Sequence, residues 1–174
     1  MKLLLTLAVS MAFTSGCAVL SPSAPIATAE LTPIAGNKVS GTTTFVRQGD
    51  KVLVDARIKG LKPGRHGFHI HEGGDCSAPD ASGIGGHFNP AGAEHGNPAS
   101  GKHHGGDLGN LDADANGNAV LNVMVTMQGL SFAKSGANSI IGRGLIVHAD
   151  ADDLTTQPGG NSGKYVACGI IVLQ

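Results

Sequence analysis

The sequence of 174 residues contains no tryptophan, one tyrosine and five phenylalanines, so aromatic residues make up only 3% of it. Charged residues are also scarce, at 14%, and 12 basic side chains face 13 acidic ones. Without a net positive charge or a basic cluster, the chain lacks the attraction that nucleic-acid binding requires. The absence of a sustained amphipathic helical stripe argues against a helical bundle. Glycine, with 27 residues, and histidine, with eight, are abundant instead.

The N-terminus has the three-part pattern of a secretory signal. The segment MKLLLTLAVSMAFTSGC contains one lysine, an apolar run and then small residues, and the run is too short for a permanent membrane-spanning helix. We expect residues 1–17 to be a signal peptide of the lipoprotein type, cleaved before Cys17, which then carries lipid. Cleavage after Ala29, in the small-residue segment ATA, is the alternative. Either cut takes the protein out of the cytoplasm. We expect it in the periplasm or cell envelope, attached to the membrane through a lipidated Cys17; otherwise it is secreted.

Residues 18–36 are rich in proline, alanine, serine and threonine and show no amphipathic period. Such a segment buries too little apolar surface to order itself, so we expect a flexible tether there. The remaining residues, 37–174, have the size of one domain with its own core.

Within residues 37–174 the apolar residues recur with a period of two. Runs such as VLVDARIKG and AVLNVMVTM alternate, and turn sequences such as KPG and DADANGN separate them. This pattern predicts an all-β fold, an antiparallel sandwich or barrel. Residues 73–108 and 149–164 do not alternate, and loops of such length inside a compact domain usually serve a function.

The chain has three cysteines. If Cys17 is consumed by processing, Cys76 and Cys168 remain as a pair in an oxidising compartment. That setting favours a disulfide joining distant segments over two free buried thiols.

Three histidines lie within the short stretch HGFHIHEGGDC, at residues 66–76. In a strand, side chains two positions apart share a face, so His69 and His71 project together. His148 ends a separate apolar run, GLIVH. The first long loop has no hydrophobic reason to fold, yet it carries four further candidates: His87, His95, His104 and Asp107. Three imidazoles and a carboxylate suit zinc, and imidazoles on strands suit copper or zinc; a loose histidine-rich tract is the alternative.

Five motifs, in order along the chain, resemble the signatures of the copper/zinc superoxide dismutase family: GFHIHEGGDC, GGHFNP, GDLGN, GLIVHADADD and ACGIIVLQ. The resemblance implies an eight-stranded antiparallel Greek-key sandwich or barrel, immunoglobulin-like, with two long functional loops. It also implies disproportionation of superoxide to oxygen and hydrogen peroxide. In that reaction copper exchanges the electrons and zinc orders the loop.

The resemblance further implies a role for each residue that matches a family motif. The implied copper ligands are His69, His71, His87 and His148. The implied zinc ligands are His87, His95, His104 and Asp107. His87 thus bridges the two metals, and Asp152 matches a carboxylate that orients ligands of both. Cys76 and Cys168 match the family disulfide, whereas His66 matches a structural position and His103 is expected to be a solvated bystander.

One position departs from the family pattern. Three residues before the second cysteine of the disulfide, the family usually carries an arginine beside the copper mouth, and this chain has Tyr165. The change removes a fixed cation that steers and orients an anionic substrate. Two hypotheses follow: a superoxide dismutase slowed by Tyr165, or a non-enzymatic copper- and zinc-binding protein for metal storage, delivery or sensing. Either could form a homodimer.

Overall fold

The computed structural model describes residues 26–49, 51–126 and 130–174. The regular elements of these residues, in chain order, are β1 (Ala27–Pro33), β2 (Ser40–Gln48), β3 (Lys51–Lys59), β4 (Gly64–Ile70), the 3-10 helix η1 (Ser82–Ile84), β5 (Asp107–Ala113), β6 (Ala119–Thr126), β7 (Gly144–His148), β8 (Tyr165–Ile170) and β9 (Val172–Leu173). None of the described segments forms a helix long and apolar enough to cross a membrane.

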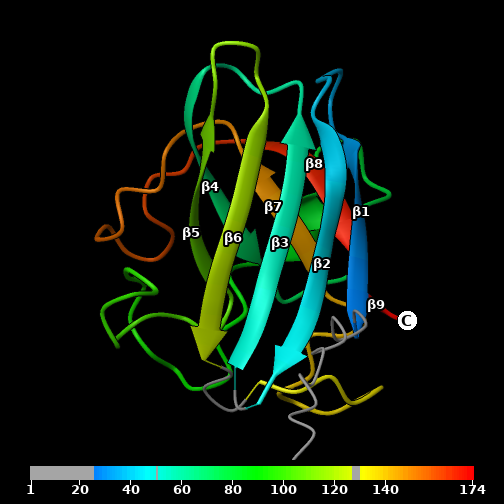
Figure 1. The fold of residues 1–174 in the computed structure, drawn as a ribbon, viewed down its shortest axis with the longest axis vertical. Helices are drawn as coiled ribbons and strands as arrows, with labels where there is room; N and C mark the ends of the chain where they lie inside the picture. Colours follow the sequence, from blue (N-terminus) through cyan, green and yellow to red (C-terminus); the bar gives the residue numbers. More distant parts are fainter. Residues whose placement is uncertain (1–25, 50, 127–129) are drawn as a thin grey trace, which may run out of the picture.

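The strands form one antiparallel sheet that curls into two layers (Figure 1). Neighbouring strands follow the order β5-β4-β7-β8-β1-β2-β3-β6, and β9 pairs with β1. Strand β1 joins the two layers, because residues 27–31 pair with β2 whereas Thr32 and Pro33 pair with β8. The predicted all-β antiparallel fold is confirmed, with its last strand interrupted at Ile171 to give β8 and β9.

Strand β3 shows how alternation in the sequence builds the core. Val52, Val54 and Ala56 are each at most 1% exposed, whereas Lys51 and Arg57, which point the other way, are exposed. Burying such side chains contributes about 25 cal/mol for each Å² of apolar surface removed from water. The resulting core lies between the two layers and draws on β1 to β8.

The prediction of a flexible tether over residues 18–36 is wrong for its second half. Residues 27–33 form β1, and Ala27, Ala29 and Leu31 are buried in the main core. The segment ATAELTP does alternate, but alanine and threonine give a weaker hydrophobic signal than larger apolar residues do. Its stability comes from pairing with β2, β8 and β9, which are distant in sequence. The domain therefore begins before residue 37, while residues 1–25, including Cys17, lie outside the described residues.

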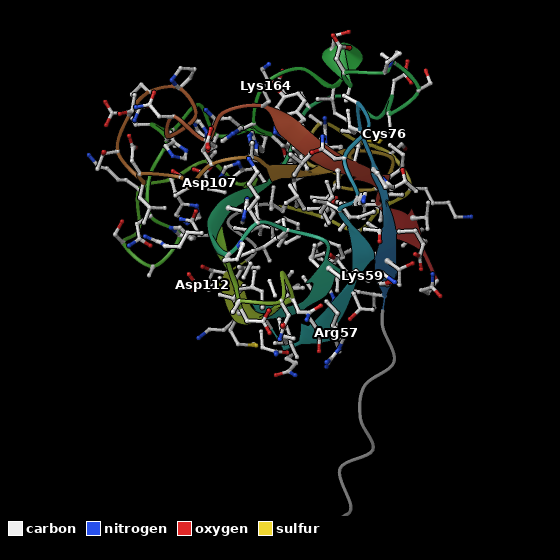
Figure 2. All side chains as sticks on the ribbon, turned by 90° about the horizontal axis from the view of Figure 1, so that it is seen from above. Arg57, Lys59, Cys76, Asp107, Asp112 and Lys164 are labelled. Carbon is white, nitrogen blue, oxygen red and sulfur yellow. A yellow bond between two sulfur atoms is a disulfide. The ribbon has the colours of Figure 1, made fainter. Side chains whose placement is uncertain are left out.

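The long loops cover the outer face of β4 and β7. Phe68 and Ile70 of β4, and Leu145 and Val147 of β7, point into the main core, so the alternation directs their neighbours to the opposite face. In Figure 2 the loop of residues 149–164 and part of the loop of residues 71–106 lie around Asp107, away from Arg57 and Lys59, whereas the first loop also runs past Cys76. The outer face of β4 and β7 is therefore the part of the sheet that the long loops cover.

Candidate metal centre

Four imidazoles meet on the outer face of β4 and β7. They belong to His69, His71, His87 and His148, all buried, and one ring nitrogen of each lies within 4.8 Å of those of the others. The strand registers are interrupted by bulges at Gly67/His69 and at Val147/His148, and bulges next to active sites commonly re-aim side chains. His87 reaches the group from the long loop, where a bridge pairs it with His71.

A second buried cluster shares one ring with the first. Its members are His87, His95, His104 and Asp107, whose ligand atoms also lie within 4.8 Å of one another. His87 Nδ1 lies 2.8 Å from Asp107 Oδ1, so this nitrogen faces the second cluster and Nε2 is left for the first. The structure thus brings together both sets of residues that the family resemblance named, with His87 between them.

Orphaned nitrogen atoms show that both clusters suit a metal ion. His69 Nδ1, His95 Nδ1 and His104 Nδ1 are buried and have no hydrogen-bond partner among the described residues. Buried polar atoms are otherwise almost always hydrogen-bonded. A cation provides the missing partner, because neutral imidazole nitrogen and carboxylate oxygen are the ligands that zinc and copper accept.

Asp152 fixes the rings on both sides of the pair. Its Oδ2 accepts a hydrogen bond from His69 Nε2 at 2.8 Å, and its Oδ1 accepts one from His95 Nε2 at 2.9 Å. These bonds hold the ring protons on Nε2 and leave the Nδ1 lone pairs free, as is usual for partners of metal ligands. Gly160 (φ +65°) lies so close to Asp152 that a side chain there would collide with the carboxylate.

Burial keeps the rings of His69, His71 and His148 neutral. Desolvation lowers the pKa of His69 to about 4, although Asp152 opposes the shift, and lowers that of His71 to about 3. Burial also lowers the pKa of His148. Although burial raises the pKa of Asp107, the imidazoles of His104 and His87 hold it well below the usual range. Neutral imidazoles beside an ionised carboxylate are the protonation states that metal binding requires.

Acidification is expected to destabilise the metal-free protein. The pKa of His69 is about 4 in the folded state against 6.5 in the unfolded chain, so between these values the unfolded chain binds more protons. The contribution of the neutral ring to the free energy of unfolding is therefore fully present above about pH 6.5, and it is lost as the pH is lowered towards 4. His69 alone accounts for about 3 kcal/mol of this loss. Urea denaturation of the metal-free protein across this range measures it, and an unchanged midpoint would contradict the assignment.

A disulfide pins the first long loop to the outer face. Cys76 and Cys168 are bonded, 92 positions apart in sequence and with 5.8 Å between their Cα atoms, so the predicted pairing is confirmed. The bond lies in a small second core formed by residues of the loop and of the outer face: Ile34, Ala81, Ile84, Ile146 and Cys168. This core holds the start of the loop that carries His87.

Arg143 is a positioning residue that the sequence did not reveal. Its Nη1 donates a hydrogen bond to the carbonyl of Glu72, the neighbour of His71, at 2.6 Å. Its guanidinium lies 3.6 Å from the ring centroid of Phe88, the neighbour of His87. One side chain thus connects the residues that follow two proposed ligands, a use to which the planar guanidinium is suited. A single arginine before a strand belongs to no motif or periodic pattern, so the sequence alone could not indicate this role.

The predictions for the two remaining histidines have different outcomes. His66 is buried, with ring nitrogens 2.9 Å from the carbonyl oxygens of Lys62 and His148, so the prediction of a structural role is confirmed. The prediction that His103 is solvated is wrong. It is only 6% exposed, because its Nδ1 folds back to the carbonyl oxygen of His104 at 2.7 Å.

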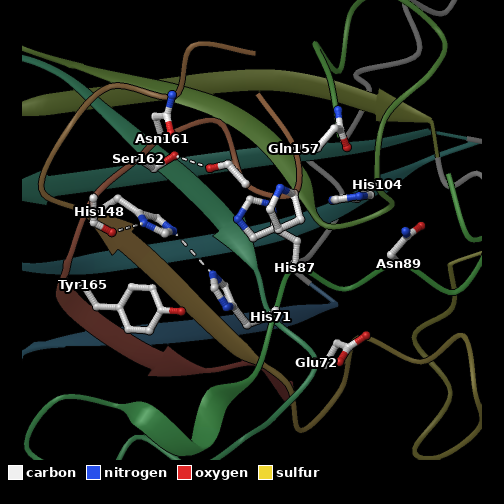
Figure 3. Close-up of a pocket in the computed structure, with 14 residues that line it drawn as sticks. His71, Glu72, His87, Asn89, His104, His148, Gln157, Asn161, Ser162 and Tyr165 are labelled. Carbon is white, nitrogen blue, oxygen red and sulfur yellow. Dashed lines mark hydrogen bonds between the residues drawn. The ribbon is translucent and has the colours of Figure 1, made fainter. Parts of the chain in front are cut away.

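A pocket of about 500 Å³ opens over the copper-side cluster (Figure 3). His71, His87 and His148 line it, together with Tyr165, which begins β8. The Tyr165 ring stands edge-on to both His71 and His148, with centroids 5.2 and 5.1 Å away. Burial raises the pKa of Tyr165, so the phenol keeps its proton at neutral pH. The described residues that line the pocket include no lysine and no arginine.

The two-layered antiparallel sheet, with two histidine clusters sharing one ring, defines a protein with a paired metal centre. The family model for copper/zinc superoxide dismutase (SODC) matches residues 39–171. The chain therefore belongs to the copper/zinc superoxide dismutase family. It is an enzyme of this type, with copper and zinc as cofactors, and this supports the enzyme hypothesis over that of a non-enzymatic metal-binding protein.

Proposed function

We propose that the protein disproportionates superoxide, outside the cytoplasm, at a copper ion linked to a zinc ion through the ring of His87. The proposed copper ligands are His69, His71, His87 and His148. The proposed zinc ligands are His87, His95, His104 and Asp107. The observation that carries the proposal is the shared ring, because one imidazole between two buried ligand sets is needed for a bridged pair and not for storage of either metal alone. A bridging ring must lose its second proton, which neighbouring cations favour.

The chain contributes positioning and proton transfer to this reaction. When bound, copper supplies the exchange of one electron with each of the paired superoxide ions, of which one becomes oxygen and the other hydrogen peroxide. His87 Nε2 is the atom placed to accept a proton and pass it to the reduced oxygen, because His87 lines the pocket. Asp152 keeps His69 and His95 in the required orientation, and burial keeps His71 and His148 unprotonated.

Rapid mixing of superoxide with the protein tests this function. The protein loaded with both metals should accelerate superoxide decay, and the metal-free protein should not. Decay that is equally slow in both samples would leave a metal-binding protein without the activity. Electron paramagnetic resonance gives an independent check, since an isolated Cu(II) signal in the fully loaded protein, with no sign of a bridging ring, would remove the proposed pair.

We further propose that Tyr165 makes the enzyme slower than it would be with arginine at this position. The variant Tyr165→Arg should accelerate superoxide decay by about tenfold and should make the rate fall as salt is added, because a fixed cation attracts the anion and salt screens that attraction. The measurement is the decay rate at a series of ionic strengths, with Lys164→Arg as a control that adds no charge. An unchanged rate and salt slope would contradict this account of Tyr165.

The N-terminal signal supports a location in the periplasm or cell envelope, and the disulfide is consistent with a place outside the cytoplasm. We propose that cleavage precedes Cys17, which anchors the protein through lipid. The alternative cut after Ala29 would sever β1 and remove Ala27, which is buried in the main core. Mass spectrometry of the mature N-terminus distinguishes a lipid-bearing Cys17 from an unmodified residue 30.

A further inference from the structure

The pocket over the copper-side cluster has polar walls but few charges. Asparagine, glutamine and serine side chains contribute to it, and Glu72 is its only acidic lining residue among those described. Arg143, which hydrogen-bonds to the backbone of Glu72, is engaged with three backbone carbonyls and the Phe88 ring, and it does not line the pocket. An anion that enters this pocket therefore meets no free cationic side chain, so the side chains that line it can hold the anion only through hydrogen bonds.

Tyr165 offers the donor best placed for this. Its ring is held edge-on between His71 and His148, and its hydroxyl points into the pocket (Figure 3). No hydrogen bond joins this hydroxyl to any other part of the described chain. The other hydroxyl in the pocket, that of Ser162, already donates to the carbonyl of Gly159 at 2.9 Å. The phenol thus has a free O–H beside two proposed copper ligands.

Lys164 is the nearest lysine in sequence, but it faces a different hollow. It lines a neighbouring pocket with Ile34, Ala35 and Asp80, and the two pockets meet only at Gly163 and Tyr165. Successive residues at the start of a strand point to opposite sides, which explains the separation. Tyr165 therefore separates the two pockets. The lysine lines the neighbouring pocket, and the phenol hydroxyl points into the pocket over the proposed copper ligands.

We propose that the Tyr165 hydroxyl is the specificity-determining donor of this site: it binds the outer oxygen of superoxide, or another small anion at the copper, by a hydrogen bond in place of a charge. This inference rests on the proposed function for its substrate, whereas the binding of small anions does not require turnover. A hydrogen bond to a charged acceptor is stronger than one between neutral groups. A neutral donor adds no charge to that of the bound metal ions, so the salt dependence of anion binding should be the same with and without the hydroxyl.

Azide serves as the probe, because it is a small anion that binds to protein-bound Cu(II) and changes its visible absorption. The protein loaded with copper and zinc is titrated with azide as the unchanged chain, as Tyr165→Phe and as Lys164→Met, and the metal content of each is measured. We expect Tyr165→Phe to weaken azide binding by about tenfold, with both metals retained. Lys164→Met, the matched control in the neighbouring pocket, should leave the affinity unchanged.

Three results would overturn the inference: an unchanged affinity in Tyr165→Phe, an equal loss in Lys164→Met, or a weaker salt dependence in Tyr165→Phe than in the unchanged protein. Tyr165→Met, which also lacks a donor, gives the same test if Tyr165→Phe disturbs folding. Superoxide decay is measured in parallel and should fall about tenfold in Tyr165→Phe. If no sample accelerated decay while azide binding still depended on the hydroxyl, the proposed function would be wrong, whereas the role of Tyr165 as a donor to small anions would be supported.

Discussion

Replacing His148 by alanine is expected to reduce the rate of superoxide decay by about a hundredfold or more while zinc remains bound. Removing even an outer partner of a metal ligand commonly costs between 10- and 100-fold in affinity or activity, and loss of a ligand costs at least as much. His148 belongs to the copper-side cluster alone, and its ring is buried. Atomic absorption on the purified variant should show copper lost and zinc kept, and rapid mixing should show little decay.

The matched variant is His104→Ala, on the opposite side of His87. His104 belongs only to the second cluster, so zinc should be lost first. Copper should remain, with an altered paramagnetic spectrum because His87 no longer bridges. Loss of both metals to the same degree from both variants would contradict two separate ligand sets joined through one ring.

The double variant Cys76→Ala, Cys168→Ala is expected to lose about 4 to 5 kcal/mol of the free energy of unfolding. The disulfide closes a loop across 92 positions of sequence, and in the chain-entropy account a loop of this length restrains the unfolded chain by about that amount. Urea denaturation of the metal-free proteins measures the loss. Using metal-free protein matters because bound metal would itself shift the midpoint.

A second measurement distinguishes the effect of the disulfide on the metal site from its effect on overall stability. Because the bond anchors the loop that carries His87, the double variant should also bind zinc and copper more weakly. The control is Ala56→Gly in β3, which destabilises the main core far from the loop. A double variant with weakened stability but unchanged metal affinity would show that the small second core alone holds the loop.

The strands and the ligands were predictable to different degrees, for physical reasons. Alternation in β3 and β6, and the spacing of His69 and His71, are local patterns that follow from strand geometry. The convergence of His87 and His148 is not local, and only the family motifs indicated it. Strand β1 was missed because its small residues take their stability from distant partners. Arg143 was missed because its contacts join two loops that the sequence does not place side by side.

The ligands of both clusters lie outside the main core, on the far side of the sheet. Phe68 and Val147 fill the interior whatever occupies the exterior of the same strands. We therefore expect formation of the scaffold and loading of the cofactors to be separable stages. A chain without metal should form its barrel first, and copper and zinc should then bind to ligand sets that are already assembled on the outer face, without refolding of the protein.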